Sequence, residues 1–386
     1  MTDLETRAAP APAGALRRAA PAFAGYAAVR ALGLLALFLW SAARDKNAYT
    51  LLTARWDALW YVRVAELGYG YEVRLANGDV HSNLAFFPLL PWLERLVAAV
   101  SPLSYADGGF LVSLISSLAA AWGIFAVADH VYGRRAGVCA VLLWAVLPVG
   151  IVQSMAYSES LFTALAAWSL YAVLTGRWVT AGTLALFAGL TRPVGLAAVA
   201  AVWVAAVDSF ARDGRAAGPG ALTRRVLGMV LAPLGTVGYV LWVGHHTGKG
   251  PLGYLDVQAG WRNGFDGGWA FARFVADKFT SFPAALAGVG LIVGVASVVW
   301  LYVTGVRQRQ PLPLLVYTGV VTVLALCASS YFGSKPRLLL PAFPLLLPLA
   351  LALAGARIRR SATVLGAVAV ACAVYGAFWL NGSGPP

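Results

Sequence analysis

Long apolar stretches separated by short polar connections run along almost the whole chain. A transmembrane helix needs roughly 20 predominantly apolar residues, and about eleven stretches approach this length. They cover 24–43, 108–131, 136–152, 159–175, 178–191, 193–208, 225–246, 283–305, 312–330, 337–355 and 361–380. The pattern therefore predicts an all-α, polytopic membrane protein with about eleven transmembrane helices.

The composition indicates the same class of protein. Hydrophobic residues make up 60% of the 386 residues and charged residues only 12%, whereas charged residues are about a quarter of a soluble domain. The formal net charge of +13 does not indicate nucleic-acid binding. The basic residues separate apolar stretches and do not gather with exposed aromatic residues on a polar domain.

The basic residues instead predict the orientation of the chain in the membrane. The positive-inside rule places three late basic connections in the cytoplasm. Counting back through the predicted spans places an earlier Arg pair and an N-terminal Arg pair on the same side. The groups are Arg17/Arg18, Arg134/Arg135, Arg212/Arg215/Arg224/Arg225, Arg307/Arg309 and Arg357/Arg359/Arg360. We therefore expect the N-terminus inside and the C-terminus outside.

Residues 86–101 are apolar but are not expected to cross the membrane. A crossing here would place some of the basic groups outside. The segment also contains Pro88, Pro91, Glu94 and Arg95, which are unfavourable in a lipid-exposed span. We predict a helix that lies in the outer interface, with its aromatic and leucine face towards the lipid.

This topology predicts a single transmembrane domain, 23–382, between a disordered cytoplasmic tail, 1–22, and an outward C-terminal tail, 383–386. The disorder is expected because the N-terminal segment is rich in Ala and Pro. Two long loops face outwards. They are 44–107, the predicted catalytic loop with juxtamembrane helices, and 247–282.

A cleaved signal peptide is the alternative interpretation of 24–43, because the small residues Ser41, Ala42 and Ala43 follow it. Its apolar run exceeds the limit of about 15 residues for a signal peptide, so we favour a transmembrane helix.

The first outward loop carries an acidic residue between aromatic rings, in the run Arg55-Trp56-Asp57-Ala58-Leu59-Trp60-Tyr61. Asp is poorly tolerated near hydrocarbon unless it has an ionic partner or a chemical task. Trp56 and Trp60 share one face of a short helix because they are four residues apart, and Asp57 lies on the neighbouring flank near Tyr61. Asp57 is therefore a candidate catalytic residue. Helix capping, or an ion pair with Arg55 or Arg63, explains the pattern equally well.

The segment Tyr157-Ser158-Glu159 lies at the outer mouth between two predicted spans. Ser158 could cap the following helix while Glu159 occupies its first turn, where the helix dipole favours an anion. The functional interpretation is that these side chains hydrogen-bond sugar hydroxyls.

Thr191-Arg192-Pro193 interrupts a long apolar stretch at the outer face. Pro193 explains the interruption by removing a helix hydrogen bond, but Arg192 is not needed for it. A guanidinium here suits bidentate binding of a phosphate. Snorkelling to lipid headgroups is the alternative.

Lys335-Pro336-Arg337 places two cations on the outward side, against the positive-inside trend. A phosphate ligand would account for them, and simple anchoring at the interface is the alternative.

Taken in order, these motifs resemble the family of the second mannosyltransferase of GPI-anchor synthesis, the PIG-V-like family. The segments that carry the resemblance are Trp56-Asp57-x-x-Trp60-Tyr61, Ala85-Phe86-Phe87-Pro88-Leu89, Tyr157-Ser158-Glu159-Ser160-Leu161-Phe162, Thr191-Arg192-Pro193-x-Gly195 and Pro336-Arg337-Leu338-Leu339. The resemblance implies a GT-C glycosyltransferase fold. It also implies a polyprenyl- or dolichyl-phosphate-linked mannose donor and an active site on the outer or lumenal face.

The resemblance also implies roles for individual residues. Asp57 matches the catalytic residue of the first outward loop. The substrate-binding residues would be Trp56, Trp60, Tyr61, Tyr157, Ser158 and Glu159, and the donor phosphate would be held by Arg192, Lys335 and Arg337. The chain departs from the family in its Arg-Pro turn, where eukaryotic members commonly carry Arg-Ser or a similar polar pair. Its Arg-rich, Lys-poor composition suggests a GC-rich bacterium that makes no GPI anchor, which leaves the acceptor open.

The implied chemistry is a single displacement at the anomeric carbon, which inverts configuration and would turn a β-linked lipid mannose into an α-mannoside. Asp57 would accept the proton of the attacking hydroxyl, and the cations would neutralise the leaving phosphate. No metal or other cofactor is expected. Cys139, Cys327 and Cys372 lie in predicted spans without CxxC or His-paired spacing.

We therefore expect an inverting mannosyltransferase of the bacterial plasma membrane. It would move mannose from polyprenyl-phosphate-mannose to a hydroxyl of a cell-envelope lipid, glycan or protein. The alternatives are a GT-C enzyme that uses another lipid-linked sugar, a transporter or flippase for polyprenyl-linked sugars, and a non-catalytic scaffold. A transporter would need polar groups through the membrane depth, whereas those of this chain gather on the predicted outer side.

Overall fold

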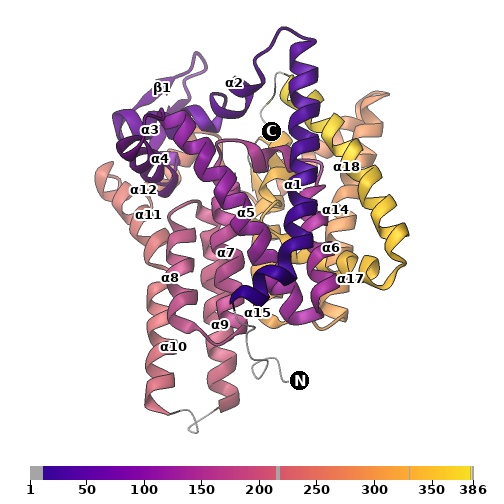
Figure 1. Cartoon of the computed structure of the whole chain (residues 1–386). Coiled ribbons are helices and arrows are strands. Elements are labelled where there is room, and N and C mark those ends of the chain that lie inside the picture. The colour runs from indigo at the N-terminus through magenta and orange to yellow at the C-terminus, as the bar shows by residue number, and fades with distance from the viewer. Residues whose placement is uncertain (1–11, 214–217, 330, 383, 385–386) are drawn as a thin grey trace.

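Helices dominate the computed structural model of the chain, which describes residues 12–213, 218–329, 331–382 and 384 (Figure 1). The longer helices that form the bundle are α1 (Pro12–Ala42), α5 (Tyr105–Tyr132), α6 (Arg134–Ala145), α7 (Ser158–Leu174), α8 (Trp178–Gly189), α9 (Leu196–Asp213), α10 (Pro219–Leu231), α11 (Leu234–His246), α14 (Ala284–Arg307), α15 (Leu312–Cys327), α17 (Leu347–Gly355) and α18 (Ile358–Leu380).

Six helical segments in the described part of the chain are long and apolar enough to cross a membrane. They are Leu16–Ala42, Tyr105–Tyr132, Pro193–Arg212, Pro219–His246, Ala284–Arg307 and Ile358–Leu380. A seventh candidate is the pair Phe332–Leu338 and Phe343–Gly355, which is bent by 76°. Shorter apolar helices cover Ser158–Leu174, Trp178–Gly189 and Leu312–Cys327. The all-α, polytopic class is thus confirmed, while the count of about eleven crossings stays a prediction.

Small residues allow the central helices to approach closely. α5 packs against α6 and α7, and α1 packs against α18 and α6. A Cβ atom added to Gly123 of α5 would lie 2.9 Å from the Cβ atom of Ala167 in α7. Close contact through such residues is the common way in which helices associate within a membrane, where lipid is as apolar as the helices.

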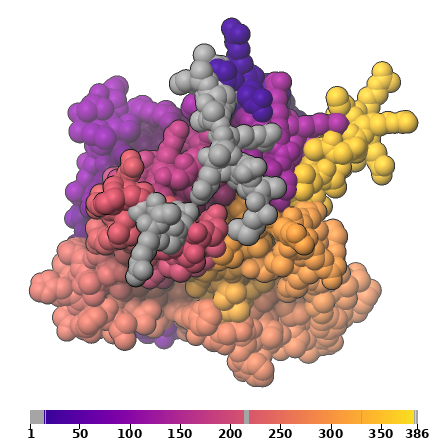
Figure 2. All heavy atoms as spheres, turned by 90° about the horizontal axis from the view of Figure 1, so that it is seen from below, coloured from indigo at the N-terminus to yellow at the C-terminus, as the bar shows by residue number. Residues whose placement is uncertain are grey.

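Several basic connections gather at one end of the bundle. Arg18 Nη2 lies 2.6 Å from Asp129 Oδ1, and Arg134 Nε donates to Arg18 O at 3.1 Å. Arg135 hydrogen-bonds Ala356 O, which brings the α5–α6 turn next to the α17–α18 turn. Figure 2 looks onto this side of the molecule, where magenta and yellow segments adjoin. We call it the basic end, and its grouping of arginines is what a common membrane side requires.

The other end, which we call the loop end, carries the two long loops (Figure 1). Its elements are α2 (Ala48–Thr53), α3 (Asp57–Leu67), β1 (Glu72–Arg74), β2 (Val80–Ser82), η1 (Asn83–Ala85), α4 (Leu89–Val100), α12 (Gly253–Gly260), β3 (Gly264–Phe265), α13 (Trp269–Asp277) and η5 (Lys278–Thr280). β1 pairs antiparallel with β2, and β3 pairs with β4 (Ala328–Ser329) after α15. Trp261 Nε1 donates to Ser82 O at 3.0 Å, so the two loops are packed together.

α4 forms the helix predicted within 86–101. Its exposed residues include Trp92, Leu96 and Val100, whereas Glu94 on the opposite side is fully buried. A Cβ atom on Gly109 of α5 would lie 2.4 Å from Glu94 Oε1, so the glycine makes room for the carboxyl group. Both Glu94 oxygens lack a hydrogen-bond partner among the described residues. The position of α4 in the outer interface stays a prediction.

The N-terminal segment differs from the predicted disordered tail. α1 begins at Pro12, so residues 12–22 are helical. Proline is favoured in the first turn of a helix, where Pro12 lies, and alanine has the highest helix propensity. Pro21 lies inside α1, where it removes one backbone hydrogen bond but does not end the helix. Residues 1–11 lie outside the part of the chain that the structure describes, as do Ser383, Pro385 and Pro386 of the predicted C-terminal tail.

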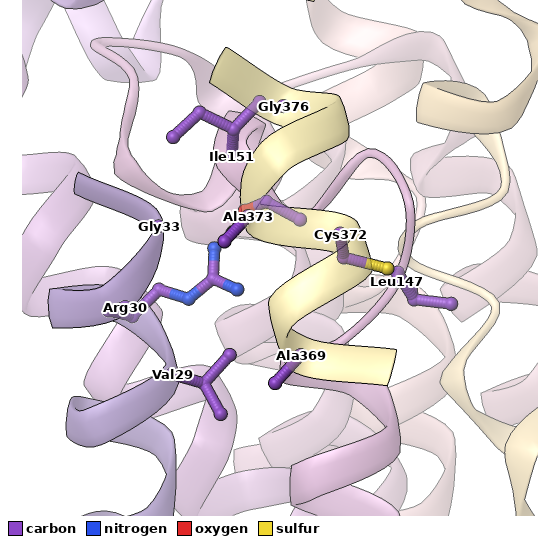
Figure 3. Close-up of a pocket in the computed structure, with 10 residues that line it drawn as sticks. Val29, Arg30, Gly33, Leu147, Ile151, Ala369, Cys372, Ala373 and Gly376 are labelled. Carbon is purple, nitrogen blue, oxygen red and sulfur yellow. Dashed lines mark hydrogen bonds between the residues drawn. The ribbon is translucent and has the colours of Figure 1, made fainter. Parts of the chain in front are cut away.

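The predicted span 136–152 is interrupted inside the bundle. α6 ends at Ala145 and the chain turns before η2 (Gly150–Ser154). Arg30 of α1 points into this turn beside a small pocket between α1 and α18 (Figure 3) and hydrogen-bonds the carbonyl oxygens of Ala145 and Gly150. Backbone groups freed by a helix break within a membrane must find such partners.

A buried tryptophan connects this interruption to a second one. Gln153 Nε2 donates to Trp144 O at 2.7 Å, and Trp144 Nε1 donates to Leu340 O at 3.1 Å. Leu340 lies between α16 (Lys335–Leu338), which follows η6 (Phe332–Ser334), and η7 (Phe343–Leu346). The segments that lead to α7 and away from α16 are therefore held by the same residue, the first through its backbone carbonyl and the second through its side chain.

Candidate functional site

Asp57 begins α3 at the loop end of the bundle. The preceding residue, Trp56, has φ 50° and ψ −120°, a backbone conformation that non-glycine residues rarely adopt. The Asp57 side chain keeps 25% of its surface exposed, and its Oδ2 atom accepts a hydrogen bond of 2.7 Å from Arg337 Nη1. The carboxylate thus has an ionic partner, although not Arg55 or Arg63, the two that sequence proximity suggests.

Arg337, on α16, contacts two carboxylates. Its Nε atom lies 3.3 Å from Glu159 Oε1, and its guanidinium carbon lies 5.0 Å from the centroid of the Tyr157 ring. The side chain is 8% exposed. A single buried guanidinium therefore joins α3 to the first turn of α7.

Glu159 is almost completely buried and has a second cationic partner, Arg192, which pairs with the same Oε1 atom. Asp57, Arg337, Glu159 and Arg192 therefore form a line of alternating charges, which we call the charge row. Its four members come from α3, α16, α7 and the break between α8 and η3 (Pro193–Gly195). Buried charges need such pairing, because removing a charged group from water without a partner is costly.

Ser158 and Tyr61 lie behind the charge row. Their hydroxyl oxygens are 2.7 Å apart, and Arg192 Nη1 donates to Ser158 Oγ at 3.4 Å. Burial raises the pKa of the Tyr61 phenol above its ordinary value of 10, and nearby Arg192 only partly opposes this shift. Tyr61 therefore stays neutral and serves as a hydrogen-bonding group.

Exposure separates the members of the site that a substrate can reach from those that it cannot. Asp57 and Arg192 have side-chain exposures of 25% and 14%. Tyr157, Ser158 and Glu159 are 1% exposed or less. The three residues expected to hydrogen-bond sugar hydroxyls are thus buried, and they contact Arg192 and Arg337 instead.

Lys335 is not brought into the charge row. Its Nζ atom donates to Ala325 O, Leu326 O and Ala328 O at 2.8, 3.2 and 2.8 Å. An ammonium group has three hydrogens to donate, so all of them are used on carbonyls at the C-terminal end of α15. The structure gives Lys335 the position of a helix cap.

The aromatic residues around Asp57 are packed against one another. Trp60 stacks on Phe86 with centroids 5.7 Å apart and meets Trp261 of the second loop edge-on at 4.8 Å. Trp56 lies under the guanidinium of Arg55, 3.9 Å from the ring centroid. The sequence did not indicate that Trp261 is a neighbour of the site, because Trp261 comes from the distant second loop.

The described residues contain no group of three or more His, Cys, Asp or Glu side chains that could hold a metal ion. The carboxylates of the site are instead engaged by arginines. What this arrangement offers chemically is one partly exposed carboxylate next to fixed positive charge, which suits proton transfer beside a developing anion.

Part of the chain is similar to a known protein family. Residues 36–216 match the family model described as mannosyltransferase (PIG-V). This range includes Asp57, Glu159 and Arg192 of the charge row but ends before Arg337. No curated protein gives a significant sequence match to the chain.

Two solved structures show the fold. ArnT from Cupriavidus metallidurans bound to undecaprenyl phosphate is 18% identical with a TM-score of 0.52, over 86% of this chain and 62% of ArnT. The oligosaccharyltransferase from Archaeoglobus fulgidus, in complex with Zn and sulfate, is 13% identical with a TM-score of 0.50, over 94% of this chain and 53% of its own. This chain thus spans less than two thirds of either protein. The chain thus has the GT-C fold of these two solved structures, and just under half of its length matches the mannosyltransferase (PIG-V) family model.

Proposed function

We propose that the protein is an inverting mannosyltransferase that moves mannose from polyprenyl-phosphate-mannose to a hydroxyl of a cell-envelope acceptor. The observation that carries this proposal is the contact between Asp57 and Arg337, in which a partly exposed carboxylate adjoins a buried guanidinium. A base and a fixed cation at this spacing can receive a proton and an anionic leaving group side by side.

A lipid phosphate donor is supported by the chemistry of the arginines. Arg192 and Arg337 flank Glu159 from two segments, and guanidinium groups bind phosphate oxygens through paired hydrogen bonds. ArnT, which has the same fold, was crystallised with undecaprenyl phosphate. In this chain Arg337 and Arg192 would contact the phosphodiester, whereas Lys335 would support the donor site only by capping α15.

The reaction is a direct displacement. The acceptor oxygen forms a bond to the anomeric carbon while the bond from that carbon to the phosphate oxygen breaks, and the phosphate leaves with the electron pair. The hydroxyl proton passes to Asp57, which neutralises its carboxylate. Arg337 then pairs with the negative charge that develops on the leaving phosphate. General base catalysis of this kind contributes about 10² to 10⁴ in rate.

We place the site on the outer face of a bacterial plasma membrane. The charge row is at the loop end, and the arginines of the α5–α6 and α17–α18 turns are at the opposite, basic end. By the positive-inside rule the basic end faces the cytoplasm. The acceptor would then approach Asp57 from outside the cell.

The test is a transfer assay with purified protein, labelled polyprenyl-phosphate-mannose and extracted cell-envelope lipids and glycans. Wild-type protein should form labelled product, and Asp57→Asn should reduce the rate at least a hundredfold while the protein still folds. Asp79→Asn is the matched control. Asp79 is 22% exposed, lies in the same loop and pairs with Arg262, away from the charge row.

Normal transfer by the Asp57→Asn protein would contradict the assignment of the base. Transfer of another sugar from its lipid phosphate, with mannose left unused, would contradict the proposed donor but keep the reaction class.

A further inference from the structure

The backbone before Asp57 is held in an unusual conformation. Trp56 has a positive φ of 50° although it is not a glycine, and its side chain makes no capping hydrogen bond to α3. The first hydrogen bonds of α3 are made by Ala58 N to Arg55 O at 3.2 Å and by Leu59 N to Trp56 O at 3.1 Å. Residues in such conformations persist only when their surroundings hold them there.

Arg55 provides that support on the Trp56 side chain. Its guanidinium carbon lies 3.9 Å from the centroid of the Trp56 ring, in the position of a cation–π contact. The same guanidinium donates to carbonyl groups at the end of α18 and just after it, with Arg55 Nη1 3.1 Å from Leu380 O and Nη2 3.4 Å from Gly382 O. Arg55 therefore joins the Trp56 ring to the end of a distant helix.

The end of α18 is itself fixed in place. Asn381 is 3% exposed and its Nδ2 atom donates to Ser41 Oγ at 3.0 Å. Lys46 Nζ donates to Asn381 O at 2.6 Å. Figure 1 shows the yellow end of α18 beside α2 and the end of α1. Carbonyl oxygens at a helix C-terminus are unpaired and carry partial negative charge, so they form a firm support for the Arg55 guanidinium.

We infer that Arg55 is a positioning residue for Asp57. It orients Asp57 by holding Trp56, whose φ is positive, in place beside the C-terminal end of α18. The inference rests on the proposed function, because Asp57 is the base there. It extends the working site to residues 380–382, which contact neither Asp57 nor the other members of the charge row.

Lys46 separates this role from simple capping of α18. Lys46 and Arg55 both donate to carbonyls within residues 380–382, but of the two only Arg55 lies over the Trp56 ring. Lys46→Gln is therefore the matched control for Arg55→Gln, because the hydrogen bond from Asn381 Nδ2 to Ser41 Oγ still holds the end of α18 when the Lys46 bond is lost. Arg55→Lys keeps a cation for the ring but loses the forked hydrogen bonds.

The first measurement is hydrogen exchange of the full-length protein in detergent, without substrate. Arg55→Gln should speed the exchange of peptides covering 55–61 by about tenfold, because the first turn of α3 then opens more often. Lys46→Gln should change only peptides near 378–382. Wild-type exchange at 55–61 in Arg55→Gln, or the same acceleration there in Lys46→Gln, would overturn the inference.

The second measurement is steady-state transfer by the same proteins. Arg55→Gln should lower kcat about 10- to 100-fold with little change in KM for the donor, because a misdirected base affects the chemical step. Arg55→Lys should recover part of the loss, and Lys46→Gln should match the wild type. Equal losses in Arg55→Gln and Lys46→Gln would count against positioning.

Failure of the proposed function and failure of the inference about Arg55 give different results in the two measurements. If the wild-type protein transfers no lipid-linked sugar, the proposed function is wrong, and the exchange of 55–61 alone decides whether Arg55 holds this turn. If Arg55→Gln does not fold, the exchange and kinetic comparisons are made between Arg55→Lys and Lys46→Gln. Faster exchange at 55–61 and lower kcat in Arg55→Lys alone support the inference, and equal effects in the two variants overturn it.

Discussion

The guanidinium of Arg337 donates a 2.7 Å hydrogen bond to the carboxylate of Asp57, although the two residues are 280 positions apart in the sequence. The cation that would bind the leaving phosphate is therefore already in contact with the group that would accept the proton. A donor phosphate at the proposed site would have to share Arg337 with Asp57, so the proposal couples binding of the donor to release of the base.

Arg337→Gln removes the guanidinium that lies between Asp57 and Glu159. We expect a loss of unfolding free energy on the order of 3 kcal/mol, because a buried carboxylate loses one of its partners. We also expect at least tenfold weaker binding of polyprenyl phosphate. Thermal unfolding and a binding assay with fluorescent polyprenyl phosphate measure the two effects. The control is Arg262→Gln, which breaks an exposed ion pair with Asp79 and should cost less than about 1 kcal/mol. Unchanged lipid affinity in Arg337→Gln would remove Arg337 from the phosphate site.

Lys335→Met should act on stability and not on the donor. The ammonium group caps three carbonyls at the end of α15, and their loss should lower the unfolding free energy by about 1–3 kcal/mol. The affinity for polyprenyl phosphate should stay within about twofold of the wild type, in contrast to Arg337→Gln. Weaker lipid binding at wild-type stability would restore Lys335 to the phosphate site that the sequence suggests.

Trp144→Phe should lower kcat, with only a small loss of unfolding free energy. The change keeps a buried ring but removes the hydrogen bond from Trp144 Nε1 to Leu340 O, which holds the segment after Arg337. Trp168→Phe removes a similar bond of 3.0 Å, to Ala119 O, at a position of α7 more than two helical turns away from Glu159. Both variants should lose about 1 kcal/mol of unfolding free energy, but only Trp144→Phe should lose turnover. Equal kinetics in the two variants would show that the bond to Leu340 does not affect the site.

Glu94 makes the stability of α4 depend on pH. Burial raises the pKa of its carboxyl group well above the ordinary value of 4.5, so the folded protein keeps the proton while the unfolded chain releases it above that pH. The contribution of Glu94 to stability is therefore fully present below pH 4.5 and is lost as the pH rises through the folded-state pKa, by up to about 1.4 kcal/mol for each pH unit in this window.

Glu94→Gln should remove this loss, because a buried amide does not ionise. Its unfolding temperature should exceed that of the wild type by a margin that grows from pH 4.5 to 8. Glu66→Gln, at an exposed position of α3, is the control and should show no such trend. A margin that does not change with pH would mean that Glu94 does not titrate in this range.

Six of the predicted spans, 24–43, 108–131, 193–208, 225–246, 283–305 and 361–380, coincide with helices long and apolar enough to cross a membrane, because hydrophobic length is a local property of the chain. Hydrophobic length does not predict the turn after Ala145. The carbonyl groups of this turn accept hydrogen bonds from Arg30, which lies more than a hundred residues earlier in the sequence. Spacing alone correctly placed Asp57 on a short helix near Tyr61.

Spacing could not identify the ionic partner of Asp57. Arg55 and Arg63 are close in sequence, but Arg55 bonds the end of α18 and Arg63 lies over the rings of Trp60 and Tyr71. Arg337 reaches Asp57 only after the bundle has assembled. For the same reason the sequence grouped Lys335 with Arg337, although the two side chains point to different partners.

The 76° bend between Phe332–Leu338 and Phe343–Gly355 has a consequence for the biogenesis of the protein. Neither arm of the pair is long enough to cross a bilayer alone, and the carbonyls at the bend are bonded by Trp144 Nε1 and by Tyr317 OH, which donates to Pro341 O at 3.1 Å. Lipid offers no hydrogen bonds to such groups. The bent pair is therefore stable in the bilayer only against α6 and α15, both of which leave the ribosome before it does, so the order of synthesis supplies the partners that this segment needs when it inserts.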